Sequence, residues 1–492
     1  MKRLTAGLLA VCLLLLSACS TGGDSGETNA PDTKMDAPTA PAAVEEEAET
    51  EAPEPVRVSD SLPEGLEFGG ASLAFYTNPY TPFACNLVED MNGEMLNDAR
   101  YQTETAVEDR LNVALSEDYG DHDPYTFNGQ VRTLIQSGDG TYSYMTNEDY
   151  IIMRQIQEGS FYALSDLPYL DLSAPYWLPD ATQLYNIGGK VWYAFCPLNL
   201  YANQNTNFIA MNLDIAEDVN IEPQYDAVQE GTWTFDRMRA LAEAAYIDLN
   251  NNGMDPADQL GLNIDMPVKN EWCGVLVGCG SMQEIITKDE NNYLTYGYTP
   301  GLVDRLELAY SLFHDFRLDM EDLPSFSKKK VLFSFTKLEM LTTAYREVDF
   351  NFGVLPMPKY DEAQERYYSR TFDACCPVIP VTCPDPDMAG AVLEALTCEA
   401  YNTTLPAYIE TGLQNKYVRD EDSSEMATIV LESQTVLVPE IMMFDQYGNS
   451  SFHSSFMEKP TMMAASVLEG KKNSTEKMIA LLNKKYAKLI DG

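Results

Sequence analysis

The loop between residues 248 and 258 has residue types and spacing that suit a metal ion. Its sequence is DLNNNGMDPAD, so oxygen-bearing side chains stand at the first, third and fifth positions and glycine at the sixth. Calcium takes about six to eight oxygen ligands, and glycine permits the sharp turn that such a loop needs. The spacing predicts a structural calcium site. Its predicted ligands are Asp248, Asn250, Asn252 and Asp258.

The second half of this loop departs from the EF-hand pattern. Gln259 stands at the twelfth position, where a bidentate acid belongs, and Asp258 comes one residue early. Asp258 reaches an ion only if the loop is tighter than an EF-hand loop. A solvated turn rich in Asn and Asp accounts for the same residues without an ion, so both interpretations stay open.

Motifs for catalysis are scarce. The 3 His of the chain, His122, His314 and His453, belong to no HExxH motif, and neither a GxSxG motif nor a phosphate-binding P-loop is present. Carboxylates are so abundant that counting does not decide whether a glycosidase pair exists, and an exported glycan-degrading protein stays an alternative. We predict no catalytic residue and no required cofactor.

The N-terminus predicts export and anchoring. Two basic residues precede an apolar run over 8–16, which is shorter than the about 20 residues that span a bilayer, so 1–18 is typical of a signal peptide. The sequence Leu-Ser-Ala-Cys that ends at Cys19 resembles the lipobox of bacterial lipoproteins, which implies acylation of the Cys19 thiol. An ordinary signal peptide that contains a cysteine is the alternative.

The next stretch, 19–62, is rich in Gly, Ser, Thr, Pro, Ala and acidic residues. It has too little apolar surface to offset its ordering entropy, and its like charges extend it. We predict a disordered acidic linker that holds the protein at the outer face of the cell membrane through its lipid alone.

The composition of the body limits its partners. The chain has 76 acidic and 32 basic residues, for a formal net charge of −44, and such a surface repels nucleic acids and anionic lipids. No later apolar segment is long enough to span a membrane. The cysteines of the body suggest buried free thiols, although Cys273 with Cys279 and Cys376 with Cys383 are close enough in sequence to form disulfides.

Strands and helices alternate along the body. Apolar runs at 71–76, 190–195 and 207–211 predict buried strands. This alternation predicts parallel-sheet α/β layers, and the chain length predicts two of them. Residues that favour helix starts, with apolar residues at helical spacing behind them, are Thr234, Thr299, Asp387 and Ser474.

Several segments, in their order and spacing, resemble the solute-binding proteins of ABC importers, in the family-one, maltose-binding-like branch common in Firmicutes. This similarity covers about 66–490. It implies an α/β fold of the two-lobed periplasmic-binding-protein type (type II), with a hinge and an interlobe cleft. It also implies a monomer without catalytic activity that delivers its ligand to the transmembrane subunits of a permease. The segments are NGEMLNDA (92–99), WTFDRM (233–238) leading to DLNNNG (248–253), FGVLPMPKYD (352–361) and DMAGAVLEAL (387–396).

The chain path of this family implies crossings between the lobes near 195–203, near 371–374 and near Pro406. The first lobe then comprises 63–197 and 373–405. The second lobe comprises 198–372 and 406–492.

The ligand has to be inferred from the residues themselves. A sugar presents hydroxyl groups at its edge and C–H groups on its faces, so its site needs aromatic walls and a few polar groups. Tyr76 and Tyr80 follow the first strand, and ligands of open α/β sheets bind beyond the carboxyl ends of strands. Asn147 holds a similar loop position.

Four more candidates lie near the crossings or in a predicted loop. Trp192 precedes the first crossing, and Trp272 lies in a segment whose polar start and following glycines suggest a loop. Arg370 and Asp373 lie at the second crossing. Core packing is the alternative role for each Trp, and a hinge ion pair is the alternative for Arg370 with Asp373.

These observations predict a substrate-binding lipoprotein that captures a carbohydrate or oligosaccharide by hinge closure. A surface adhesin for glycans is the second alternative, and it needs no closing hinge.

Overall fold

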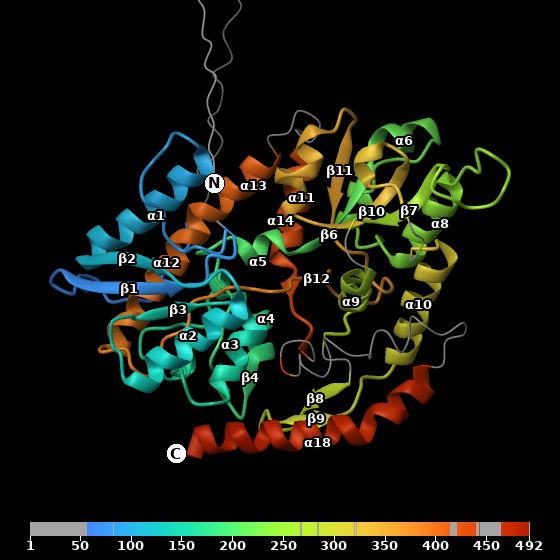
Figure 1. Ribbon diagram of the computed structural model, residues 1–492. Helices are drawn as coiled ribbons and strands as arrows, with labels where there is room; N and C mark the ends of the chain where they lie inside the picture. Colours follow the sequence, from blue (N-terminus) through green and yellow to red (C-terminus); the bar gives the residue numbers. More distant parts are fainter. Residues whose placement is uncertain are drawn as a thin grey trace, which may run out of the picture. The chain divides into compact units, whose positions relative to one another are not determined.

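The first of two main sheets consists of three parallel strands in the order β2-β1-β3 (Figure 1). Parallel strands need crossover connections, and helices supply them here. Leu73 and Phe75 of the central strand are buried. We call this sheet and its helices the first lobe. Its strands are β1 (Ala71–Thr77), β2 (Val113–Tyr119) and β3 (Tyr144–Thr146), and its longer helices are α1 (Met95–Leu111), α2 (Pro124–Ser137), α3 (Asp149–Ile156) and α12 (Pro386–Asn402).

The second sheet has four strands in the order β11-β6-β10-β7. β10 runs parallel to β7, whereas β6 is antiparallel to both of its neighbours. Nearly every residue of these strands is buried, as expected for a sheet covered on both faces. We call it and its helices the second lobe. The strands are β6 (Asn207–Asn212), β7 (Leu260–Ile264), β10 (Val331–Lys337) and β11 (Phe352–Leu355), and the longer helices are α8 (Phe235–Ala245), α9 (Val268–Gly278), α10 (Leu302–Asp315) and α14 (Glu421–Glu432).

The computed structural model describes residues 57–81, 83–265, 268–282, 285–318, 320, 322–413, 421–438, 442 and 464–491. All of them belong to one compact unit, Arg57–Gly492. The shorter helices are α4 (Pro179–Thr182), α5 (Tyr201–Gln204), α6 (Leu213–Asp218), α7 (Tyr225–Gln229), α11 (Glu339–Thr342) and α13 (Thr404–Leu413), and the C-terminal helix is α18 (Ala464–Asp491). The remaining strands form the pairs β4 (Asn186–Ile187) with β5 (Lys190–Val191), β8 (Ile286–Lys288) with β9 (Leu294–Tyr296), and β12 (Ser369–Arg370) with β13 (Gln434–Thr435).

Helix starts follow the predicted capping chemistry in part. The Thr234 hydroxyl accepts a hydrogen bond from the Arg237 N–H at 3.3 Å and caps α8, as predicted. The cap of α12 is Asp385 rather than Asp387. The predicted start at Ser474 is wrong, because α18 begins at Ala464 and the Ser474 hydroxyl donates to the Lys471 carbonyl within the helix.

Two further predictions needed correction. Only Lys190 and Val191 of the predicted strand 190–195 pair as a strand, because their partner β4 has two residues. The segment around Trp272, predicted as a loop, is helix α9, in which buried apolar residues run through Val277.

Two segments that connect the two sheets, around Thr206 and Thr371, lie side by side with a third segment around Gln434. The hydroxyls of Thr206 and Thr371 are 2.8 Å apart, and these residues form an isolated β-bridge. The Gln434 side-chain amide donates to the Thr206 hydroxyl at 2.6 Å, and the Thr371 N–H donates to the Thr435 carbonyl at 2.7 Å. We call these segments the crossings. Pro406 lies in α13, which packs against α1 and α12 as well as against α11 and α14. The lobe boundaries inferred from sequence stay predictions.

Residues 57–62, which we assigned to the linker, contact the first lobe. Arg57 forms two hydrogen bonds with the Glu399 carboxylate at 2.6 and 2.7 Å, and Asp60 pairs with Arg110. Leu62 is buried. Among the described helices, none has the length and apolar composition to cross a membrane.

The cysteines of the body carry free thiols. Seven of them are buried and Cys85 is half-buried. Neither Cys273 with Cys279 nor Cys376 with Cys383 is bonded in the structure, in line with the expectation of buried thiols.

Candidate ligand-binding site

The site begins where two parallel strands of the first lobe end. Thr77 of β1 pairs with Thr146 of β3, so the segments that follow them, Asn78–Tyr80 and Asn147–Asp149, leave the same edge of the sheet. The buried Asn147 amide donates to the Pro124 carbonyl at 3.0 Å, and its side-chain oxygen accepts from the Glu148 N–H. Asn147 therefore fixes the loop that carries Glu148.

A buried amide ties these strand ends to the chain that leads to the second lobe. The Asn86 side-chain nitrogen donates to the hydroxyls of Thr77 and Thr146, both at 3.0 Å. The Asn199 amide donates to the Asn86 side-chain oxygen at 3.2 Å. Asn86 was not predicted from sequence, because nothing in its local sequence indicates that it joins two strands and a crossing.

Four tyrosines and two carboxylates gather beside this junction. The Tyr150 hydroxyl donates to Glu148 Oε2 at 2.6 Å, and the Tyr150 ring lies 6.4 Å from the Tyr125 ring. In a second pair of tyrosines, the rings of Tyr80 and Tyr201 are 6.1 Å apart. Burial raises the pKa of Tyr150 and of Tyr201, and the negative charge of Asp373 adds to both shifts, after the larger effect of Glu148 on Tyr150. We call Tyr80, Tyr125, Tyr150, Tyr201, Glu148 and Asp373 the tyrosine cluster.

The cluster has an exposed and a buried layer. Tyr80 and Tyr125 are 52% and 48% exposed, whereas Tyr150, Tyr201 and Glu148 are buried. Burial raises the pKa of Glu148, and the negative charge of Asp123 adds to this shift, although the hydrogen bond from Tyr150 opposes it. The exposed rings offer flat apolar surface and the layer behind them offers hydrogen-bonding groups. This combination suits a sugar.

A cationic group from the second lobe approaches the crossing from the carboxyl end of β10. Lys337, the last residue of that strand, donates to the Asn205 side-chain oxygen at 3.0 Å and pairs with Glu339. Its ammonium lies 5.8 Å from the centre of the Phe372 ring. The buried Arg370 guanidinium lies 4.5 Å from the same ring.

The other predicted aromatic residues lie outside the tyrosine cluster. Tyr76 stacks on Phe127 at 4.9 Å, and its hydroxyl donates to Gln130 at 3.0 Å. Trp192 is 4% exposed and packs on Tyr486 of α18 at 5.3 Å. The buried Trp272 packs on Phe313 of α10 at 5.6 Å. Contact of these three rings with a ligand stays a prediction.

Of the predicted ligand-binding residues, Tyr80 packs on Tyr201, whose pKa Asp373 raises after the larger effect of burial, and Asn147 lies next to Glu148. Contact of these residues with a ligand stays a prediction. Tyr125, Tyr150 and Tyr201 were not predicted. The signal of Tyr150 and Tyr201 in the sequence is weak, because a tyrosine in a short or mostly buried helix has the same pattern as a core residue.

The predicted calcium loop forms one hydrogen-bonded turn. The Asp248 carboxylate accepts backbone N–H groups from residues 250–253, which lowers its pKa. The side-chain amides of Asn250 and Asn252 donate to Asp255 at 2.9 and 2.8 Å. The buried Asp258 accepts from the Leu249 N–H at 3.0 Å. Within the described ranges, no group of three or more His, Cys, Asp or Glu is placed to hold a metal ion. Calcium binding stays a prediction.

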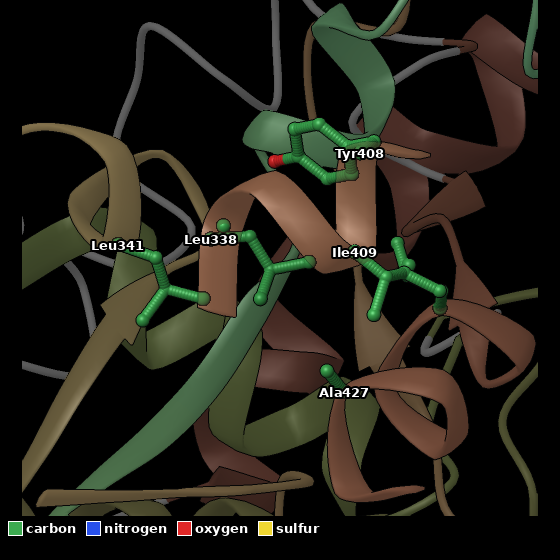
Figure 2. Close-up of a pocket in the computed structure, with 7 residues that line it drawn as sticks. Leu338, Leu341, Tyr408, Ile409 and Ala427 are labelled. Atoms are coloured by element: carbon green, nitrogen blue, oxygen red, sulfur yellow. The ribbon is translucent and has the colours of Figure 1, made fainter. Parts of the chain in front are cut away.

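A small apolar hollow lies between α11, α13 and α14 (Figure 2). Its lining is apolar apart from the Tyr408 hydroxyl, so it lacks the several hydrogen-bonding groups that a sugar needs. The lining residues are Leu338, Leu341, Tyr408, Ile409, Gly412, Ala427 and Leu431.

Comparison with known proteins establishes the fold. No protein-family model and no curated protein matches the chain. Among solved structures, a sugar transporter from Rhizobium etli in an open conformation matches with a TM-score of 0.56 at 13% identity, over 84% of this chain and 99% of that chain.

Two further solved structures match over a similar length. The galacto-N-biose-/lacto-N-biose I-binding protein of the ABC transporter from Bifidobacterium longum, in complex with lacto-N-biose, has a TM-score of 0.55 at 11% identity, over 85% of this chain and 98% of that chain. UspC from M. tuberculosis has a TM-score of 0.52 at 13% identity, over 83% of this chain and 100% of that chain. The chain has the two-lobed α/β fold of periplasmic-binding proteins, which confirms the predicted fold class.

Proposed function

We propose that the chain is the substrate-binding protein of an ABC importer and that it captures a carbohydrate or oligosaccharide. The observation that carries the proposal is the tyrosine cluster, which lies at the carboxyl ends of β1 and β3 and beside the crossings. Ligands of open α/β sheets bind at such strand ends. The fold is also that of the sugar transporter and the lacto-N-biose-binding protein described above.

The mechanism is closure of the two lobes around the ligand. Tyr80 and Tyr125 provide stacking surfaces on the first lobe, and Lys337 brings a hydrogen-bond donor from the second lobe to the crossings. A ligand that contacts both lobes favours the arrangement in which both sets of contacts form. The permease then distinguishes the liganded from the unliganded protein. No step of this cycle requires catalysis.

The setting of this function follows from the sequence. Cys19 and most of the 19–62 linker lie outside the described residues. Support for lipid anchoring at the outer face of the membrane comes from the signal pattern and the lipobox-like residues. The proposal includes a monomer that docks on permease transmembrane subunits and touches the membrane through its lipid alone.

A thermal-shift screen with mono- and oligosaccharides tests the proposal. A sugar present at about one hundred times its Kd should add about 2.7 kcal/mol to the free energy of unfolding and raise Tm. The same samples should show no cleaved products, since cleavage would indicate a glycan-degrading enzyme. Small-angle scattering with the bound sugar should show a smaller radius of gyration. Binding without any such change would favour an adhesin.

A further inference from the structure

The β8–β9 hairpin reaches from the second lobe to the first. It lies between α9 and α10 in the chain, and both helices belong to the second lobe. The segment 183–191 belongs to the first lobe, because the Tyr185 hydroxyl donates to Asp149 of α3 at 2.9 Å. The Lys288 ammonium nevertheless donates to the backbone carbonyls of Gln183 and Leu184 in this segment, at 2.9 and 3.1 Å. The Gly188 N–H donates to the Asn292 carbonyl in the hairpin turn at 3.1 Å.

Helix α18 holds the outer strand of this hairpin. The Asn483 side chain forms two hydrogen bonds with the backbone of Leu294, donating to its carbonyl at 2.7 Å and accepting from its N–H at 3.1 Å. Near the start of the helix, the Leu468 carbonyl accepts from the Tyr296 hydroxyl at 3.0 Å. Figure 1 shows α18 running alongside β8 and β9.

The last turns of α18 pack on the first lobe. Tyr486 is fully buried against Trp192, and Lys485 donates to the Gln157 side chain at 3.1 Å. A methyl group at Gly188 would lie 2.4 Å from the Ile490 side chain, and one at Gly159 would lie 3.1 Å from Leu489. The helix therefore contacts α10 and the hairpin along part of its length and the first lobe at its end.

We propose that the β8–β9 hairpin and α18, together the strap, hold the two lobes in the relative arrangement of this structure. The strap contacts are non-covalent and involve other residues than the crossings. Because they form only when the lobes stand in this arrangement, they stabilise it against any other. The strap thus regulates the opening and closing on which the proposed function rests. A ligand that requires a different arrangement has to release it.

Two adjacent glycines of the β4–β5 turn give a matched test on the full mature chain. Gly188 and Gly189 have φ values of 61° and 82°, so alanine strains the backbone at both positions. Only the methyl group of Gly188→Ala meets the strap, at Ile490 and Tyr293, whereas nothing lies within 4 Å of the corresponding position at Gly189. Gly188→Ala therefore wedges the strap away from the first lobe, and Gly189→Ala is its control.

Hydrogen exchange and small-angle scattering without ligand are the measurements. Amides in 286–296 and 483–491 should exchange about ten- to one-hundred-fold faster in Gly188→Ala than in Gly189→Ala, since overpacking weakens the docked state. The radius of gyration should increase in the same variant. Equal exchange in both variants would contradict the contact of the strap with the first lobe. Faster exchange in Gly188→Ala with an unchanged radius of gyration would contradict the proposal that the strap holds the lobes in place.

A second pair of variants covers the case in which Gly188→Ala does not fold. Asn483→Ala removes both hydrogen bonds to Leu294, and Asn473→Ala changes an exposed residue of the same helix. The same contrast in exchange and in radius is expected. The strap and the proposed function fail in different measurements. If the variants differ as expected but no carbohydrate binds in the screen, the strap proposal holds and the proposed function is wrong. If a sugar binds but all four variants behave alike, the proposed function holds and the strap proposal is wrong.

Discussion

A buried carboxyl group shows how one residue sets a pH dependence. Glu104 on α1 accepts a hydrogen bond from the Val88 N–H at 2.7 Å. Burial raises its pKa to about 8, and the Val88 N–H and the Arg100 guanidinium offset only part of that shift. In the unfolded chain this carboxyl ionises first, at its ordinary value near 4.5. Ionisation therefore favours unfolding as the pH rises between these two values.

We expect the free energy of unfolding to fall by up to about 5 kcal/mol between about pH 4.5 and 8 through this group alone. Glu104→Gln keeps an acceptor for the Val88 N–H and carries no charge, so its stability should vary less over the same window. Chemical denaturation at several pH values measures the difference. Glu89→Gln at an exposed site is the control, and a Glu104→Gln profile parallel to that of the wild type would contradict the assignment.

Two tyrosines near the end of β1 should separate binding from packing. Tyr80 is 52% exposed, so Tyr80→Ala should weaken carbohydrate binding about ten- to one-hundred-fold, or about 1 to 3 kcal/mol, with little effect on Tm. Tyr76 packs on Phe127 and Tyr142, so Tyr76→Ala should lower Tm. Titration with the best sugar from the screen and thermal melts measure both. Loss of stability in Tyr80→Ala as large as in Tyr76→Ala would remove Tyr80 from the site.

The sequence predicts where a single residue lies only when its immediate neighbours in the chain determine that position. Tyr80 was chosen because it follows the first strand, and Asp373 because it lies near a crossing, and their contact with a ligand stays a prediction. Tyr150 and Tyr201 could not be predicted, since they join the cluster only when the ends of β1 and β3 meet the chain before β6. Trp192 and Trp272 are large rings that suit a sugar, but the sequence does not distinguish stacking on a ligand from packing in the core. In the structure, Trp192 packs on Tyr486 and Trp272 packs on Phe313.

At the scale of elements, residues that favour helix caps predict some helix starts correctly and others wrongly. Thr234 caps α8 as its sequence predicts, because the cap is a contact with the next turn of the same helix. Ser474 misleads, because a serine inside a helix can bond to its own backbone, and the buried Val467 and Leu468 extend α18 upstream. The pairing of β8–β9 with α18 joins distant segments and has no local signal.

The loop between α8 and β7 gives an element-scale test for metal binding. Asp248→Ala should lower Tm more in calcium than in chelator, since a bound ion adds stability only to the folded state. Thermal melts in both conditions decide the matter. The Asp248 carboxylate already accepts backbone N–H groups from 250–253, so an equal loss in calcium and in chelator would mean that it serves the turn alone.

At the scale of the whole molecule, the proposed attachment to the membrane depends on the N-terminus. Cys19→Ala should release the protein into the medium or leave its signal peptide uncleaved, because no thiol remains to carry the lipid. Fractionation of cells and medium, with mass measurement of the N-terminus, distinguishes these results from wild type. Retention of the variant in the membrane fraction at the wild-type level would contradict lipid anchoring at this residue.

The fold class could be predicted because it follows from a pattern that runs through the whole chain. Alternating strands and helices indicate α/β layers, and the resemblance of several segments, in their order, to solute-binding proteins implies two lobes. The contacts between the layers could not be predicted from such a pattern. Those of Thr206 with Thr371, or of Lys288 with Gln183, join residues that are far apart in sequence, and each polar partner has an ordinary local context.

The contacts between the crossings described above involve hydroxyl, amide and backbone groups, although the chain carries a formal net charge of −44. Ions in solution screen interactions between exposed charges but hardly affect hydrogen bonds between buried neutral groups. The crossings should therefore keep the same contacts in dilute and in salty surroundings. The junction between the lobes would therefore respond to osmotic change far less than the acidic surface does.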